Sequence, residues 1–367
     1  MSEGIDGTSL VKKINTEKLM AKKGGEISWY QANDFFTKRE QKLMDENSQY
    51  MILAVEEARR MAGVKDFGNK TGVFIGTLTA GLPFAEIYYE NALKEKYYPR
   101  YITQCYRASV TNNVASRYGI KGQRVTITTA CSASVHAIGL GFRYIRAGKL
   151  DMAIVGGVDA FCGVTWGGFS SLKALSTENI APFSKDRNGT LIGEGSGVLI
   201  VESLASAKKR GATIYGRICG YGSSSDAYHI TAPNATGETS AEAMIRAIKD
   251  ASLKASDIEL IGAHGTATIL NDAMESRAIK LVFGEHCEKI YVTSIKSMIG
   301  HTMGAAGIHL AIAILGMFRD QLIYPTIHYT QEDPECNLNY VTNHAIEKKL
   351  NTALINGFGF GGNNSSV

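Results

Sequence analysis

The sequence predicts an α/β protein built from two packed halves, and three observations support this. The chain has 367 residues, whereas a single hydrophobic core usually stops growing at roughly 250 to 300 residues. Its 44% hydrophobic residues, 20% charged residues and 6 prolines are typical of a compact globular protein. Short apolar runs alternate with longer amphipathic stretches, which is the pattern of strands alternating with helices.

The individual elements follow from hydrophobic periodicity. Short apolar runs predict strands at residues 125–129, 152–158, 198–202, 258–263, 290–294 and 353–356. Apolar positions at helical spacing predict helices at residues 47–62, 132–147, 239–251 and 304–319. Basic residues followed by Gly211 indicate the end of a helix near residues 208–212. We therefore expect an N-terminal half at residues 1–210 and a C-terminal half at residues 211–367.

Charge and composition exclude several classes of protein. The formal charge of +4 is spread along the chain without a basic block, so we expect no nucleic-acid partner and no polybasic membrane anchor. The first twenty residues contain no apolar core of signal-peptide length, and the apolar stretch around residues 308–318 is too short to span a bilayer. The six cysteines include no CxxC pair, so reduced thiols in a cytoplasmic protein are expected.

Polar residues follow several of the predicted strands. Cys131 comes after a strand and opens a helix, and His264 ends a strand. Lys296 and His301 lie in the connection from another strand to a glycine-rich helix start, and Gly357 to Gly362 follow the last strand. Because sites in open α/β sheets assemble at the carboxyl ends of strands, these segments predict one pocket.

Cys131 is the candidate nucleophile. A helix N-terminus lowers the pKa of a thiol and favours the thiolate, and a strand–nucleophile–helix arrangement exposes the reactive atom. A lone histidine at the place of His264 is more often a structural residue, and Lys296 alone would usually be a solvated surface charge. No second ligand lies three or four residues from either His264 or His301, so we expect no metal.

The segment NGFGFGGNN formally contains GxGxxG at Gly357, Gly359 and Gly362. The chain ends at Val367, which leaves no room for the helix that would bind a pyrophosphate, so dinucleotide binding is disfavoured. A glycine loop that carries Phe360 is better suited to gating a pocket or presenting a backbone amide to an oxyanion.

Four blocks, TACSAS, AHGTATILND, IKSMIGHTMGAAG and GFGFGGNN, together resemble the signature blocks of β-ketoacyl-acyl carrier protein synthases, in the same order. The similarity extends through PFSKDRNGTLIGE and DAYHITAP and covers nearly the whole chain. The resemblance implies a thiolase-like fold, in which two similar βαβαβαββ halves form five αβαβα layers, normally as a dimer. It also implies an acyltransferase that makes carbon–carbon bonds in fatty acid or type II polyketide biosynthesis and needs no cofactor.

The resemblance assigns roles to the matching residues. Cys131 would be the acylated nucleophile, and His264 and His301 would promote decarboxylation of a malonyl thioester. Lys296 and Glu275 would form a supporting ion pair.

The resemblance also predicts a gate and a partner. Phe360, in the loop that starts at Gly359, would be a gating phenylalanine, and the amides of Cys131 and Phe360 would stabilise an oxyanion. The stretch TKREQKLMDENSQY is similar to the family's basic docking region, so Arg39 and Lys42 are candidates for contacting an acidic acyl carrier protein; ordinary solvated charges are the equal alternative.

Three departures from the family pattern stand out. The strand and glycine turn that usually precede the region of Gly4, roughly thirty residues by average element lengths, are absent, and the chain stops just after the glycine loop. Ala267 and Ile269 replace the commoner glycine and proline, and Asn363 replaces a threonine. Thr129 and Ser132 around Cys131, together with the HGTATI block, favour a specialised polyketide or polyene synthase slightly over housekeeping fatty acid synthesis.

Two alternatives to an elongating synthase remain. A non-elongating partner subunit, similar to a chain-length factor, would shape the tunnel of a heterodimer, but such subunits usually lose the cysteine. A thiolase would share the fold, but two histidines and the IKSMIGH block differ from its Cys-His-Cys arrangement.

Overall fold

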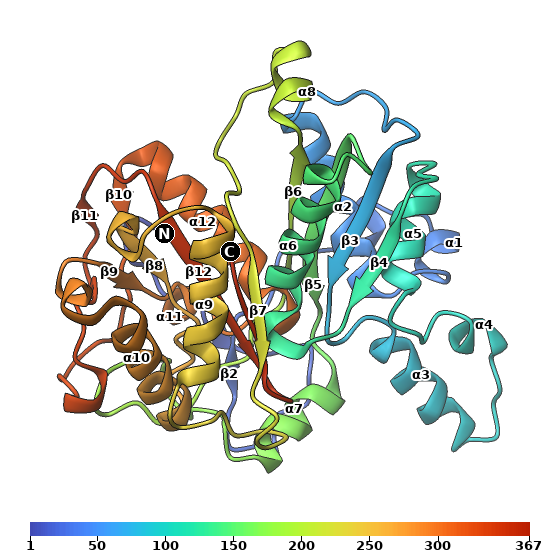
Figure 1. Cartoon of the computed structure of the whole chain (residues 1–367). Coiled ribbons are helices and arrows are strands. Elements are labelled where there is room, and N and C mark those ends of the chain that lie inside the picture. The colour runs from blue at the N-terminus through green and yellow to red at the C-terminus, as the bar shows by residue number, and fades with distance from the viewer.

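The computed structural model describes all 367 residues and contains two mixed β-sheets (Figure 1). The strands run in the order β4–β3–β5–β6 in the first sheet and β7–β13–β12–β8–β9 in the second. The first sheet consists of β3 (Thr71–Gly76), β4 (Arg124–Ile127), β5 (Met152–Asp159) and β6 (Gly195–Glu202). The second consists of β7 (Gly222–Ser225), β8 (Leu260–Gly262), β9 (Tyr291–Thr293), β12 (Ala353–Gly359) and β13 (Asn363–Ser366).

The two sheets repeat one topology. In the first, β4, β3 and β5 are parallel and β6 is antiparallel to β5. In the second, β9, β8 and β12 are parallel and β13 is antiparallel to β12, with β7 added beyond β13. Thus β5 and β12 are equivalent central strands, and the halves are similar, as the family resemblance implies.

Helices form three layers around the two sheets, which gives the expected αβαβα order. Between the sheets lie α6 (Ala133–Arg146) and α12 (Ala306–Asp320). The outer face of the first sheet is covered by α2 (Glu46–Met61) and α5 (Ser109–Arg117), and that of the second by α9 (Glu238–Asp250) and α10 (Ile269–Phe283). Figure 1 shows α2 and α5 on one side of the molecule and α9 and α10 on the other.

The core lies mainly between the sheets. A cluster of 25 buried residues joins α6 and α12 to both sheets, and it includes Ile138, Val155, Ile308 and Ile355. Because β5 has helices on both faces, its side chains from Ala153 to Asp159 are all buried, as expected for a strand that reads as a continuous apolar run. The segment Met303–Asp320 is also apolar enough to span a membrane, but 61% of it is buried, so we interpret it as a core helix.

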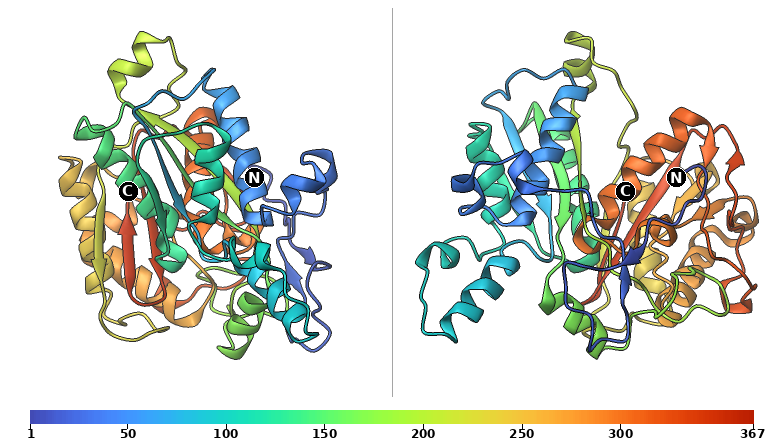
Figure 2. Two further views of the ribbon diagram at one scale, coloured as in Figure 1. Left: turned by 90° about the vertical axis from the view of Figure 1, so that its right-hand side faces the viewer. Right: turned by 180° about the vertical axis from the view of Figure 1, so that it is seen from behind.

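The remaining helices and strands are short. They are β1 (Ser9–Leu10), β2 (Lys23–Gly24), α1 (Lys38–Gln41), α3 (Leu82–Ala92), α4 (Pro99–Ile102), α7 (Gly163–Ser171), α8 (Leu204–Lys209), α11 (Lys296–Ile299), β10 (Leu322–Ile323) and β11 (Ile346–Glu347). The N-terminal segment crosses the back of the molecule (Figure 2), and its Gly7 N–H donates to the Met298 carbonyl at 2.8 Å. The predicted division at residue 210 stays a prediction.

The sequence patterns located four helices and six of the nine strands in the two main sheets. The short strands β1, β2, β10 and β11, and helices that include α5 and α10, were not predicted. Three strands of the main sheets were missed as well. The missed strands are β3, β7 and β13; the last two read GSSS and NNSS and have no apolar residue to indicate them. The glycine-rich segment was also placed wrongly, since Gly357 and Gly359 lie within β12 and only Gly361 and Gly362, with φ of 79° and 74°, form the turn to β13. A positive φ at two successive positions is accommodated best by glycine.

Candidate active site

Cys131 lies at the start of the central helix α6. It sits in a 3₁₀ turn (Ala130–Ser132) that connects β4 to the helix, and its side chain is only 5% exposed. Ala130 has a φ of 48°, a conformation that costs energy for a residue with a side chain and that often marks functional sites. The strand–nucleophile–helix arrangement predicted from the sequence is therefore present.

His301 and His264 come from the C-terminal half and lie beside Cys131. The Nε2 atom of His301 is 3.0 Å from the Cys131 Sγ atom. The rings of His264 and His301 are 5.5 Å apart between centroids, at 86° to each other. Three residues that are far apart in the sequence thus meet at one point, as predicted from their places at strand ends.

Glu275 and Lys296 support the His264 segment but do not form the predicted direct ion pair, because both are occupied by the backbone. The Glu275 carboxylate accepts hydrogen bonds from the N–H groups of His264 at 2.8 Å and Gly265 at 2.7 Å, and from Asn356 Nδ2 at 3.1 Å. The Lys296 ammonium donates to the His264 carbonyl oxygen. The two charges therefore act on each other through space.

Burial dominates the electrostatics of the site. It lowers the pKa values of His264 and His301 well below their usual range, and the charge of Lys296 lowers them further, so both imidazoles are neutral at pH 7. Burial lowers the pKa of Lys296 to about 8, against the opposing effect of Glu275, and raises the pKa of Glu275 to about 6. It also raises the pKa of Cys131 to about 12, although Lys296 opposes this rise. The expectation of a resting thiolate was therefore wrong, because loss of solvation outweighs the helix N-terminus.

A cavity of about 320 Å³ leads to these residues. Its walls include Cys131, His264 and His301, together with Phe169 and Phe360. The rings of Phe169 and Phe360 stack with centroids 5.7 Å apart. An aromatic pair at the wall next to the nucleophile is consistent with the predicted gate, but that role stays a prediction.

The predicted oxyanion site lies where β12 approaches the Cys131 turn. A Cβ atom on Gly359 would lie 2.7 Å from the Thr129 carbonyl oxygen and 3.2 Å from the Cys131 nitrogen. Only glycine permits so close an approach, which brings the start of the Phe360 loop next to the Cys131 amide. The role of the two amides stays a prediction.

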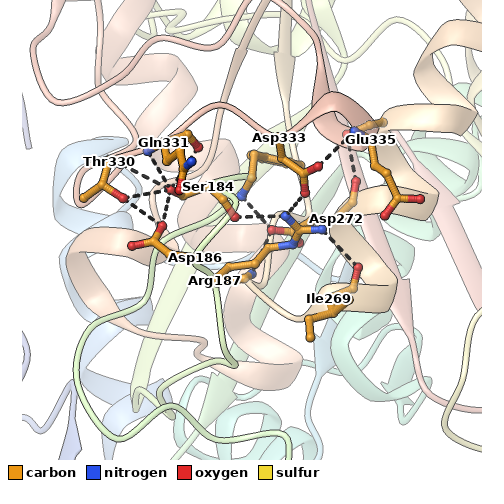
Figure 3. A network of polar contacts seen from close by, with 12 residues as sticks. Ser184, Asp186, Arg187, Ile269, Asp272, Thr330, Gln331, Asp333 and Glu335 are labelled. Atoms are coloured by element: carbon orange, nitrogen blue, oxygen red, sulfur yellow. Dashed lines mark hydrogen bonds and ion pairs between the residues drawn. The ribbon is translucent and has the colours of Figure 1, made fainter.

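A buried polar network holds the segment after His264 (Figure 3). The Asp272 carboxylate accepts from the N–H groups of Phe183 at 2.7 Å, Thr266 at 3.0 Å and Ala267 at 3.1 Å. Arg187 forms an ion pair with Asp333 and donates to the carbonyl oxygens of Ser184 and Ile269. Ala267 has a φ of 62°, and this network holds it there.

No role was predicted for Asp272 or Arg187. Asp272 lies in the AHGTATILND block and Arg187 in the PFSKDRNGTLIGE segment, both of which resemble the family. The available signal was the position of both residues in segments that resemble the family. Lys173 was missed as well; it is exposed at the cavity wall.

The structure brings together possible metal-binding atoms from residues that are far apart in the sequence. One donor atom from each of Cys131, His264 and His301 lies within 4.8 Å of the other two. The argument from sequence spacing does not apply, because these ligands come from three separate connections. The expectation that the protein needs no metal stays a prediction.

Arg39 and Lys42 lie outside the cavity. Arg39 is exposed on α1, and Lys42 is exposed just after it. Neither residue is in the cavity wall. Their predicted contact with a carrier protein therefore concerns a separate surface and stays a prediction.

Comparisons with known proteins agree with this geometry. Residues 3–207 match the family model described as "Beta-ketoacyl synthase, N-terminal domain", and residues 215–330 match "Beta-ketoacyl synthase, C-terminal domain". A 3-oxoacyl-[acyl-carrier-protein] synthase 2 of Staphylococcus aureus is 36% identical over 99% of this chain and 93% of its own length. The protein of the same name from Synechocystis is also 36% identical, over 100% of this chain and 91% of its own length.

Solved structures are similar over the whole chain. A structure described as the ishigamide ketosynthase/chain length factor has a TM-score of 0.94 and 32% identity, and covers 100% of this chain and 92% of its own. A type II polyketide ketosynthase in complex with its acyl-carrier protein has a TM-score of 0.92 and 31% identity, with the same coverage. The fold is thus the thiolase-like fold that the resemblance implied, and the chain belongs to the beta-ketoacyl synthase family.

Proposed function

We propose that this enzyme is a β-ketoacyl synthase that lengthens an acyl chain by decarboxylative Claisen condensation with a malonyl unit on an acyl carrier protein. The observation that carries the proposal is the meeting of the Cys131 thiol with two neutral imidazoles at the end of one cavity. A nucleophile for acyl transfer and two hydrogen-bond donors for an enolate are what this chemistry needs.

In the first step Cys131 takes the acyl group. His301 Nε2, 3.0 Å from the sulfur, accepts the thiol proton as the sulfur attacks the thioester carbonyl. The amides of Cys131 and Phe360 stabilise the tetrahedral oxyanion. Its collapse breaks the bond to the carrier thiolate, which leaves with the proton returned by His301.

In the second step the malonyl thioester loses its carboxylate as carbon dioxide. The bonding electrons form an enolate, whose oxygen accepts hydrogen bonds from the neutral imidazoles of His264 and His301. The enolate carbon attacks the acyl group on Cys131, and the cysteine sulfur leaves as a thiolate that takes up one proton from solvent to restore the thiol. The product is a β-ketoacyl thioester two carbons longer.

The partners and location follow from the same family relationship. We propose an acyl carrier protein as the partner, because the relatives are named for it and one similar ketosynthase was solved with its carrier. A homodimer, or a heterodimer with a related subunit, is supported by the similar ketosynthase/chain length factor. We place the enzyme in the cytoplasm, and Arg39 and Lys42 remain the proposed carrier contacts.

The test is intact-protein mass spectrometry after incubation with a panel of acyl-carrier thioesters. We expect a mass gain equal to the acyl group in the wild-type protein and in Cys162→Ala, a control that alters another buried cysteine. Cys131→Ala should not gain mass. His301→Ala should lose malonyl-dependent release of carbon dioxide. A wild-type protein that is never acylated, with or without a partner subunit, would favour the non-elongating alternative.

A further inference from the structure

Asp159, the last residue of β5, is a buried carboxylate without a role in the proposed reaction. Its side chain is 0% exposed. Oδ1 accepts hydrogen bonds from the N–H groups of Leu78 at 2.8 Å and Thr79 at 2.7 Å, and from the hydroxyls of Thr77 and Thr79 at 2.9 Å each. Oδ2 accepts from the Gly304 N–H at 2.6 Å. All of these donors are neutral, so the site is built to hold an anion by hydrogen bonds alone.

The bond to Gly304 crosses from one half of the protein to the other. Asp159 belongs to the first sheet, which lies in the same half as Cys131. Gly304 lies in a 3₁₀ turn (Met303–Ala305) at the start of α12, three residues after His301. The Asp159 carboxylate therefore ties the segment that carries His301 to the half that carries Cys131.

The backbones are closely packed where the end of β5 contacts the start of α12, and there is no space for an added side chain. A Cβ atom on Gly304 would lie 2.8 Å from Asp159 Oδ2 and 2.8 Å from Thr77 Cα. On the same strand, a Cβ atom on Gly157 would lie 2.7 Å from Ser134 Cβ and 2.9 Å from Ala305 Cα. The end of β5 thus contacts the starts of both central helices, so a change at Asp159 would be transmitted to the His301 segment.

We call the contact between the end of a central strand and the start of the opposite central helix a crossing: Asp159 with Gly304 is one, and Gly359 with Cys131 is the other. The second of these forms the proposed oxyanion site. There β12 ends at Gly359, next to the amide of Cys131 at the start of α6. Here β5 ends at Asp159, next to the amide of Gly304 at the start of α12. The residues before these two amides, Ala130 and Met303, both have a φ of 48°. One crossing faces the cavity, and the other is filled by a carboxylate.

We propose that Asp159 is a positioning residue for the reaction: its carboxylate fixes the start of α12 against β5 and so holds the His301 imidazole against the Cys131 thiol. This inference rests on the proposed function for its effect on condensation. Its effect on the thiol can be measured without that function.

Asp159→Asn tests the proposal selectively. The amide oxygen can still accept from Leu78 and Thr79, but the NH₂ group then faces the Gly304 N–H and cannot accept from it. We expect condensation and release of carbon dioxide to fall by roughly 100-fold, the cost of a displacement of about 1 Å at a reacting group. Asp151→Asn is the matched control, because Asp151 is exposed at the other end of the same strand.

Alkylation of Cys131 by iodoacetamide provides a readout that a merely structural role would not change. The charge of Asp159 raises the pKa of the Cys131 thiol, so its removal should shift the alkylation profile to lower pH; a one-unit shift is about a tenfold rise in rate below the pKa. If the wild-type protein does not condense acyl groups, the proposed function fails, and this profile still tests Asp159. A folded Asp159→Asn protein with wild-type condensation and a wild-type alkylation profile would overturn the proposal.

Gly304→Ala changes the other partner of the contact between Asp159 and Gly304. It is the second test of the proposal if Asp159→Asn does not fold. Its methyl group pushes the α12 start away from Asp159 but leaves the carboxylate charge in place. We expect loss of carbon dioxide release and slower alkylation of Cys131, because His301 no longer lies against the thiol. The profile should not shift to lower pH, because the charge of Asp159 is kept. Wild-type release of carbon dioxide by Gly304→Ala would show that the contact does not position His301.

Discussion

Glu275→Gln should cost stability and narrow the pH range of activity. The side chain is 0% exposed, and its two oxygens accept from the backbone N–H groups of His264 and Gly265 at 2.8 and 2.7 Å. Glutamine is nearly the same size but replaces one oxygen with an NH₂ group, so one of the two N–H groups loses its partner. A buried donor without a partner costs about 1 to 3 kcal/mol, and each kcal/mol corresponds to about 2 to 4 °C in melting temperature for a unit of this size.

The same change should alter the titration of Lys296. The negative charge of Glu275 opposes the burial that lowers the pKa of Lys296 to about 8. Without that charge the pKa falls further, so Lys296 loses its proton at lower pH. We expect the alkaline limb of the condensation rate to move to lower pH, together with a melting temperature several degrees lower.

The assay combines thermal unfolding with condensation rates measured across both limbs of the pH profile. Glu285→Gln is the control, because Glu285 is exposed just after α10. The reasoning is refuted if Glu275→Gln melts with the wild-type protein and keeps the wild-type alkaline limb. A lower melting temperature with an unmoved limb would show that Glu275 supports the backbone but does not act on Lys296.

The other predictions concern pH, the gate and the docking surface. Wild-type condensation should fall above about pH 8, as Lys296 loses its proton, and Lys296→Met should remove this limb; a limb that survives the substitution would exclude Lys296 as its source. Phe360→Ala removes the stack on Phe169. It should change the acyl transfer rate several-fold in single-turnover acylation and leave the melting temperature close to that of the wild-type protein. Arg39→Glu and Lys42→Glu should raise the KM for carrier-bound substrate at low salt and leave kcat unchanged; a KM that does not change would return both residues to ordinary surface charges.

The nucleophile and its two histidines could be predicted because each stands at the end of a strand. Parallel strands bring their carboxyl ends to the same edge of a sheet, which groups His264 with His301, after β8 and β9 of the second sheet. Cys131 follows β4 of the first sheet, so the packing of the two halves against each other brings it to the histidines. The place of a residue at a strand end predicts where its side chain lies but not which groups it contacts. The ion pair between Lys296 and Glu275 that the resemblance implied is not formed, because backbone groups of one segment occupy both side chains.

The thiol pKa could not be predicted for a related reason. The start of a helix is visible in the sequence and favours a thiolate at Cys131. Burial is not visible, because it depends on side chains brought in from the other half. Burial raises the pKa of the Cys131 thiol more than Lys296 lowers it, which favours the neutral thiol. The resting nucleophile then needs a base, which makes the 3.0 Å approach of His301 a requirement of the chemistry as well as a contact.

The two halves have the same topology, but only one of the two crossings between them forms a reactive centre. Comparison of the two crossings shows why. Both place a helix start, preceded by a residue with φ of 48°, against the end of a central strand. At Cys131 the opposing strand ends in Gly359, which has no side chain to cover the Cys131 amide, and both residues line the cavity. At Gly304 the opposing strand ends in Asp159, whose carboxylate takes the hydrogen bond that a substrate oxygen would otherwise need. The second crossing therefore cannot bind an oxyanion, and its rigidity instead serves the first, because it fixes the segment from which His301 reaches the thiol.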